Sequence, residues 1–149
     1  MPAPPPSLKA RALRLLGTRE HSREELRRKL EPFEEQAGAL SQILDGLQAE
    51  GFINAQRVIE SVVHRRAPKL GAARIKQELR DKGLDPHAIT QALANLEASE
   101  HQRALAVWRK KFSAPPSDAA DAARQMRFLA TRGFSADLIR RLVKYPAST

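Results

Sequence analysis

The chain contains one helix-like segment twice. Residues 71–83 read GAARIKQELRDKG and residues 122–133 read AARQMRFLATRG, and both segments end on a basic residue followed by glycine. An offset of 50 positions (124 − 74 = 50) aligns Arg74 with Arg124, Leu79 with Leu129, Lys82 with Arg132, Gly83 with Gly133 and Ile89 with Ile139. The region near the N-terminus aligns less closely, with Leu30 on Leu79 at an offset of 49. Self-similarity at a fixed period indicates tandem copies of one supersecondary unit.

Helix signals dominate each copy, and strand signals are nearly absent. Apolar residues recur at helical spacing, and serine, asparagine, proline and glycine mark the helix ends. The predicted helices span about 7–16, 22–32, 37–50, 54–67, 71–83, 85–96, 100–112, 117–133 and 135–143. Residues 22–25 (SREE) form a capping box, Ser117 and Ser135 are expected N-caps, and Gly83 suits a left-handed helix end.

These signals predict an all-α fold of three tandem three-helix repeats that form an elongated, curved molecule. The repeats are expected at 8–53, 54–98 and 99–145, with a disordered proline-rich tail at 1–7 and a second tail at 146–149. One such unit is too small to bury a good core alone, so we expect neighbouring units to stack and share apolar surface.

Positive charge is concentrated toward the C-terminus. The chain of 149 residues carries a net charge of +9, which divides as 8 − 8 = 0 over residues 1–50, 8 − 6 = +2 over 51–102 and 10 − 3 = +7 over 103–149. This asymmetry favours an anionic partner, with nucleic acid first in line. The alternative is a solvated basic surface that binds nothing.

Motifs for catalysis or cofactor binding are absent from the sequence. The seven glycines form neither a dinucleotide-binding nor a phosphate-binding loop, the four histidines lack metal-ligand spacing, and there is no cysteine. We therefore expect no enzyme, no cofactor and no metal site. The N-terminus does not read as a signal peptide, and no run approaches the roughly 18 apolar residues of a membrane span. We expect a cytoplasmic protein with no membrane partner.

Basic side chains are the candidates for partner binding. The predicted binding residues are Arg65, Arg66, Lys69, Arg74, Lys82, Lys110, Lys111, Arg124, Arg127, Arg132 and Arg140. Many of them lie near helix C-termini, where a cation also favours the helix dipole. That explanation fails for Arg74 and Arg124, which lie near helix starts at matching repeat positions, so these two are the favoured contact residues.

Four segments in order carry a family resemblance. TREHSREELRRKL (18–30), LQAEGFINAQRVIESVVHRRA (47–67), GAARIKQELRDKGLD (71–85) and RFLATRGFSADLIRRLV (127–143) resemble the RecX family of RecA regulators. The resemblance covers residues 8 to 144 and implies three tandem three-helix repeats. It also implies a non-enzymatic regulator that binds the groove of the RecA–ssDNA filament and suppresses its ATPase, strand-exchange and SOS co-protease activities.

Two other readings stay open. Three-helix units resemble helix-turn-helix folds, so the chain could instead be a nucleic-acid-binding module that contacts ssDNA or dsDNA directly. It could also be a helical scaffold for a different protein partner. No large apolar stripe is left over once the core faces are assigned, so we expect a monomer.

Overall fold

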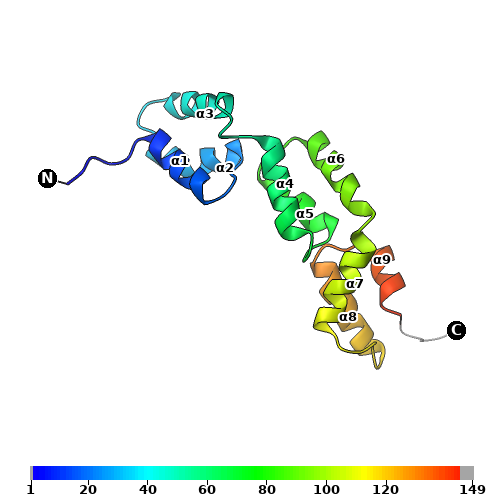
Figure 1. Ribbon diagram of the computed structural model, residues 1–149. Helices are drawn as coiled ribbons and strands as arrows, with labels where there is room; N and C mark the ends of the chain where they lie inside the picture. The colour runs from blue at the N-terminus through cyan, green and yellow to red at the C-terminus, as the bar shows by residue number, and fades with distance from the viewer. Residues whose placement is uncertain (1, 145–149) are drawn as a thin grey trace.

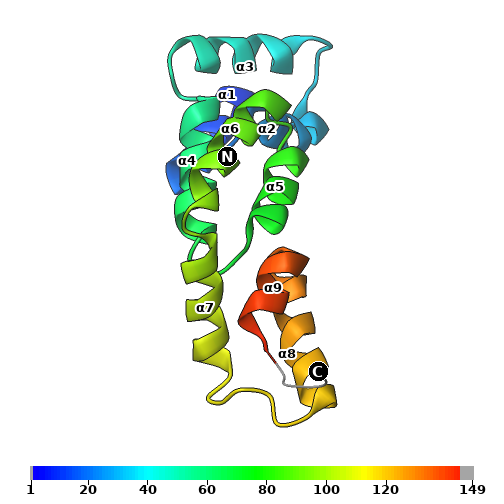
Figure 2. The same ribbon diagram turned by 90° about the vertical axis from the view of Figure 1, so that its right-hand side faces the viewer.

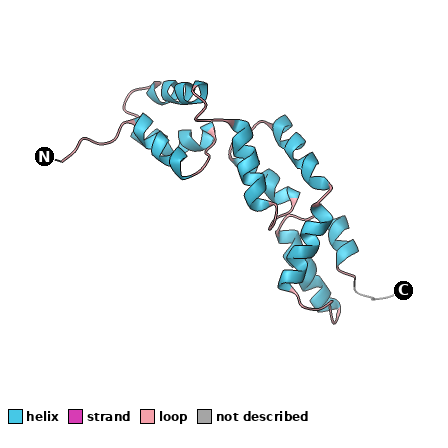
Figure 3. Cartoon of the chain, viewed as in Figure 1, coloured by secondary structure: helices cyan, strands magenta, loops and turns pink. Residues whose placement is uncertain are grey.

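The computed structural model describes residues 2–144, and all regular structure within this range is helical (Figure 3). The helices follow one another in three groups of three along an elongated, bent molecule (Figure 1). This confirms the predicted all-α fold of tandem three-helix repeats. The predicted end of the third unit at residue 145 and the tail at 146–149 lie outside the described residues. Residues 2–6 are exposed and have no regular secondary structure.

Each repeat contains three helices. Repeat 1 comprises α1 (Leu8–Thr18), α2 (Arg23–Leu30), a short 3₁₀ turn η1 (Glu31–Phe33) and α3 (Ala39–Ala49). Repeat 2 comprises α4 (Ala55–Arg66), α5 (Ala72–Asp81) and α6 (Pro86–Glu97). Repeat 3 comprises α7 (Glu100–Lys111), α8 (Ala119–Thr131) and α9 (Ala136–Leu142). Figure 2 shows the three groups in succession from a second direction.

Side-chain caps and glycines set the helix ends. The Ser22 hydroxyl accepts from the Glu25 amide while the Glu25 carboxylate accepts from the Ser22 amide, so the predicted capping box is present. Ser135 caps α9 as predicted. The prediction for Ser117 was wrong, because the neighbouring Asp118 carboxylate accepts from the Asp121 amide and caps α8. Gly83 ends its helix in the left-handed region, as predicted.

Each repeat buries its own apolar cluster. The three clusters centre on Leu26 and Leu44 in repeat 1, on Ile75 and Leu79 in repeat 2, and on Leu129 in repeat 3. The expectation of shared apolar surface between neighbours was therefore wrong. Helix pairs in extensive contact all lie within one repeat, and neighbouring repeats meet through polar groups.

The second helices of the repeats line up end to end. The hydroxyl of Ser22, at the start of α2, donates to the carbonyl of Lys82, just after α5, at 2.7 Å. In the same way the amide of Gly71, at the start of α5, donates to the carbonyl of Arg132, just after α8, at 2.7 Å. In each contact the acceptor is a carbonyl that a helix end leaves unpaired, and the aligned helix dipoles attract one another. This junction geometry accounts for the repeated segment, because α5 and its copy α8 each dock by the same C-terminal turn.

Candidate partner-binding surface

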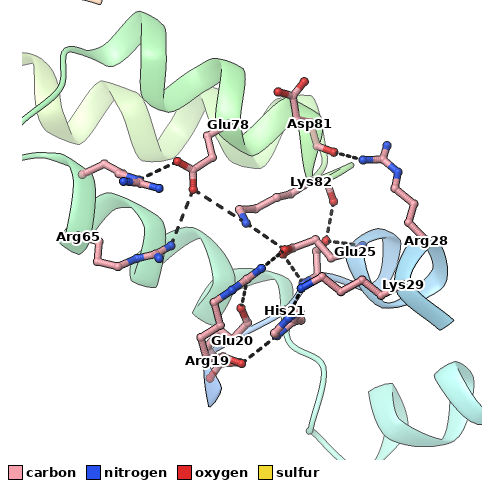
Figure 4. A network of polar contacts seen from close by, with 12 residues as sticks. Arg19, Glu20, His21, Glu25, Arg28, Lys29, Arg65, Glu78, Asp81 and Lys82 are labelled. Carbon is pink, nitrogen blue, oxygen red and sulfur yellow. Dashed lines mark hydrogen bonds and ion pairs between the residues drawn. The ribbon is translucent and has the colours of Figure 1, made fainter. Parts of the chain in front are cut away.

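Three of the predicted binding residues belong to an ion-pair network that joins repeats 1 and 2 (Figure 4). Glu78 on α5 accepts from Arg66 at 2.8 Å and lies 3.8 Å from Arg65 and 3.9 Å from the Lys82 ammonium. Lys82 also pairs with Glu25 of repeat 1 at 3.1 Å, and its side chain is only 12% exposed. The structure thus gives Lys82 a role in the junction, while Arg65 and Arg66 stay about half exposed.

Glu25 is the centre of this junction. Its carboxylate accepts from Arg19 at 2.6 Å, from Lys82 at 3.1 Å and from the Ser22 amide at 3.1 Å. Burial alone would raise the pKa of this carboxyl group, but these donors outweigh it and lower the pKa to about 2. At neutral pH Glu25 is therefore an anion that two cations from different repeats share.

His21 is buried beside the same junction. It is 1% exposed, its Nδ1 lies 3.1 Å from the Arg19 carbonyl, and its Nε2 lies 3.0 Å from the Lys29 ammonium. Burial lowers the pKa of His21, the Arg19 carbonyl raises it in part, and the nearby cations lower it further. A neutral ring with a protonated Nδ1 fits this site, since Nε2 can then accept from Lys29.

Arg74 lies at the junction between repeats 2 and 3. Its guanidinium donates to the Thr131 carbonyl at the end of α8, at 2.6 Å. The Ala73 amide donates to the Gly133 carbonyl at 3.3 Å, and Ala72 donates to the Glu100 carboxylate at 3.1 Å. The structure therefore gives Arg74 a partner inside the molecule.

The cognate residue Arg124 is in a different setting. It lies on the exposed side of α8, where it pairs with Asp121 one turn earlier at 2.8 Å. Arg140 likewise pairs with Asp137 on α9, and Arg127 is exposed on α8. Exposed pairs of this kind contribute about 0–1 kcal/mol and exchange readily for other anions. These three arginines are available at the surface of repeat 3.

Four of the predicted residues come together around one hollow. Lys110 and Lys111 on α7, Arg132 after α8 and Lys69 in the α4–α5 connection line a cavity of about 460 Å³. Its remaining lining is apolar, from Pro68, Ala106, Val107 and Phe128, and none of its lining residues is acidic. We call this cavity the repeat 3 hollow.

The Phe128 ring is already covered by its neighbours. The Arg132 guanidinium lies over the ring at 3.6 Å from its centroid, the Lys111 ammonium lies at 5.8 Å, and Phe112 packs edge-on at 5.2 Å. These contacts help to position two of the four cations of the hollow, Arg132 and Lys111. Sequence reasoning found the cations but missed Phe128 and Val107, whose spacing on α7 and α8 gave only a core signal.

Arginines at the starts of α4 and α7 were also missed. Arg103 on α7 donates to the carbonyls of Ala67 and Leu70, at 2.9 and 2.8 Å, beyond the end of α4. Arg57 on α4 reaches back in the same way to Glu20, at 2.8 Å, in the α1–α2 connection. Both arginines lie near the start of the first helix of their repeat, and this common position was the one feature of the sequence that could have identified them.

Within residues 2–144 there is no group of three or more histidine, aspartate or glutamate side chains placed to hold a metal ion. No helix in this range is long and apolar enough to cross a bilayer. The arrangement instead defines a class, that of tandem three-helix repeat proteins with basic side chains on their surface.

Comparisons with known proteins assign the chain within this class. Family models described as "RecX, second three-helix domain" and "RecX, third three-helix domain" match residues 56–93 and 98–143. The regulatory protein RecX of Leptothrix cholodnii is 50% identical over 93% of this chain and 88% of the relative, and that of Ralstonia nicotianae is 47% identical over 97% and 91%. The chain belongs to the RecX family of regulatory proteins.

Solved structures support the fold. A crystal structure of RecX from Lactobacillus salivarius superposes with a TM-score of 0.74 at 24% identity, covering 91% of this chain and 92% of that one. A second structure, of a regulatory protein RecX, superposes with a TM-score of 0.76 at 21% identity, covering 91% and 70%.

Proposed function

We propose that this chain is a non-enzymatic regulator, mainly an inhibitor, of the RecA recombinase. It binds along the groove of the RecA–ssDNA filament and suppresses ATP hydrolysis, strand exchange and the SOS co-protease activity. The observation that carries this proposal is the 50% identity to a curated regulatory protein RecX over 93% of the chain. We also propose that the chain acts in the cytoplasm, as a monomer and without a cofactor.

The shape and charge of the molecule support such a role. Three repeats in a row form an elongated body that can contact more than one protomer of a helical filament (Figure 1). Several weak contacts made together raise affinity through effective concentration rather than through one strong site. Repeat 3 presents Arg124, Arg127 and Arg140 at its surface, so binding should weaken as salt is raised.

The test is RecA ATPase activity on ssDNA with this protein titrated in, beside a titration of the protein onto bare ssDNA at the same salt. We expect inhibition at protein concentrations well below those that coat bare DNA, because the filament itself is recognised. Inhibition only where the bare DNA is already coated would mean competition for the strand, and would overturn the proposal.

A second candidate function is direct nucleic-acid binding. It is favoured by the net charge of +7 over residues 103–149 (10 − 3 = 7), and phosphate contacts need no specific pocket. This reading predicts a footprint on DNA without RecA. Weak contact with ssDNA or dsDNA beside the filament is compatible with both readings, so the affinity ratio between filament and bare DNA decides between them.

A further inference from the structure

The repeat 3 hollow combines an apolar floor with a basic rim. Ala106, Val107 and Pro68 supply aliphatic surface, and the cations of Lys69, Lys110, Lys111 and Arg132 stand around it. None of the lining residues is acidic, so the rim cations that line it are not neutralised from within the hollow. A ligand that fills it therefore needs both an apolar group and negative charge.

Repeat 1 contains a second hollow of the same kind. It has a volume of about 200 Å³ and lies between α1 and the end of α2, and its lining residues are Arg11, Arg14, Leu15, Lys29, Leu30 and Phe33. Again no lining residue is acidic. The Arg11 guanidinium lies over the Phe33 ring at 3.8 Å, as Arg132 lies over Phe128 in repeat 3. We call this cavity the repeat 1 hollow.

The two hollows occupy the same place in the repeat. Leu15 and Val107 each lie three positions after a fully buried alanine of the first helix, Ala12 or Ala104. Phe33 and Arg132 each lie three positions after a buried leucine of the second helix, Leu30 or Leu129. The groove between first and second helix is thus open and basic in both terminal repeats.

Repeat 2 places an acidic side chain in the corresponding groove. The matching positions on α5 are Glu78, one before the buried Leu79, and Lys82, three after it. Glu78 pairs there with Arg65, Arg66 and Lys82, so the cations of this groove share an anion of their own repeat. The middle repeat therefore differs from the two hollows, whose lining residues include no acidic side chain.

We propose that each hollow binds an extended acidic protein segment, whose apolar side chain enters the hollow while flanking carboxylates pair with the rim. The chain then holds two copies of one element on a repeating partner. A protein ligand fits better than a stacked nucleotide base, because Arg132, Lys111 and Phe112 already cover the Phe128 ring. This inference rests on the proposed function, since a filament presents identical elements at regular intervals.

The experiment begins with a random eight-residue peptide library panned on the full chain. The selected peptides are expected to be acidic with one leucine, isoleucine, methionine or phenylalanine. A labelled peptide from this selection is then titrated by calorimetry, with an oligo-dT of similar charge as a competitor. We expect two bound peptides for each chain, and no displacement by the oligonucleotide.

Two variants block the hollows separately. Ala106→Trp fills the repeat 3 hollow without changing charge, and Arg14→Glu reverses a rim charge of the repeat 1 hollow. Each is expected to reduce the stoichiometry to one peptide, and the double variant to none. Matched controls are Ala94→Trp, on the exposed side of α6, and Arg109→Glu, exposed on α7 outside the hollow. Both controls should still bind two peptides.

Three results would overturn the inference: selection of neutral or basic peptides, unchanged stoichiometry in the blocked variants, or displacement by oligo-dT, which would assign the hollows to nucleic acid. Circular dichroism of each variant checks that it folds. Inhibition of RecA ATPase by the wild-type chain, measured on the same preparation, tests the proposed function separately. If the chain inhibits RecA but binds no acidic peptide, the inference about the two hollows is refuted and the proposed function is not.

Discussion

At the scale of single residues, two glycines at the junction of repeats 2 and 3 leave the least room for a side chain among the glycines of the chain. A Cβ atom on Gly71 would lie 2.4 Å from the carbonyl carbon and oxygen of Gly133. A Cβ on Gly133 would lie 2.6 Å from the amide nitrogen of Arg74, and Gly133 also has a φ of +89°. The Arg74 Cγ atom would lie closer still, at 2.5 Å, but in both cases a backbone atom is also too close, so neither glycine can accept a side chain unless the repeats move apart.

Gly71→Ala should therefore destabilise the protein by about 1–3 kcal/mol, as overpacking does. The matched control is Gly46→Ala within α3, where a Cβ would meet nothing within 4 Å. That substitution should stabilise the helix by roughly 0.5–1 kcal/mol. Urea unfolding of both variants measures the difference, and equal stabilities would contradict the close backbone approach.

Arg74 and Arg124 separate a structural role from a surface role. From the sequence we predict that reversing both to glutamate lowers filament affinity without loss of helicity, and this stays a prediction. Arg74→Glu should also lower the free energy of unfolding by about 1–2 kcal/mol, because the hydrogen bond from Arg74 to the Thr131 carbonyl is lost. Arg124→Glu replaces an exposed pair and should change stability by less than about 0.5 kcal/mol. Thermal unfolding measures the stability of each variant, and a binding assay measures its affinity for the filament. An Arg74→Glu protein as stable as wild type would refute the junction role of Arg74.

At the scale of elements, local signals predicted the helices because each helix carries its own start, stop and apolar face. The capping box at Ser22 and the glycine at position 83 lie where the sequence indicated. The junctions could not be predicted, because they join residues far apart in the chain, such as Arg74 and Thr131. Of the candidate site, the sequence supplied the cations, but which of them face Glu78 and which surround a hollow depends on these long-range contacts.

Arg103 shows how one helix fixes the end of another. The carbonyls of Ala67 and Leu70 accept from its guanidinium, and burial lowers the pKa of this guanidinium while Glu100 raises it. Arg103→Ala should cost about 2–3 kcal/mol, because hydrogen bonds from a charged donor to two carbonyls are lost. Arg109→Ala, exposed on the same helix, should be nearly neutral. Chemical unfolding measures the free energy of unfolding of both variants. Equal values would show that Arg103 does not stabilise the contact between α7 and the end of α4.

At the scale of the whole molecule, the two junctions use different chemistry. The ion pairs Lys82–Glu25 and Arg57–Glu20 join repeats 1 and 2. Repeats 2 and 3 are instead joined mainly by hydrogen bonds to backbone carbonyls, from the Gly71 and Ala73 amides and from Arg74. Backbone amides do not titrate, but carboxylates do. Acid should therefore weaken the first junction more than the second, where Glu100 is a carboxylate acceptor but the other contacts are hydrogen bonds to backbone carbonyls.

Glu25→Gln tests this difference. The folded pKa of about 2 lies below the ordinary value of 4.5, so the stabilisation by Glu25 is present above pH 4.5 and is lost as pH falls toward 2. Each pKa unit corresponds to about 1.4 kcal/mol, so at pH 7 the variant should be less stable by up to about 3 kcal/mol. The gap from wild type should shrink steadily as urea unfolding is repeated from pH 5 down to pH 3.

The matched control is Glu50→Gln, whose carboxylate is half exposed and 3.9 Å from Lys9. Its stability should stay within about 0.5 kcal/mol of wild type at every pH. Both variants keep His21, whose lowered pKa also costs stability as pH falls below 6.5. The Glu25 charge partly raises the pKa of His21, so this contribution cancels for Glu50→Gln and only in part for Glu25→Gln. A gap for Glu25→Gln that stays constant with pH would show that the junction depends on the shape of the side chain rather than on its charge.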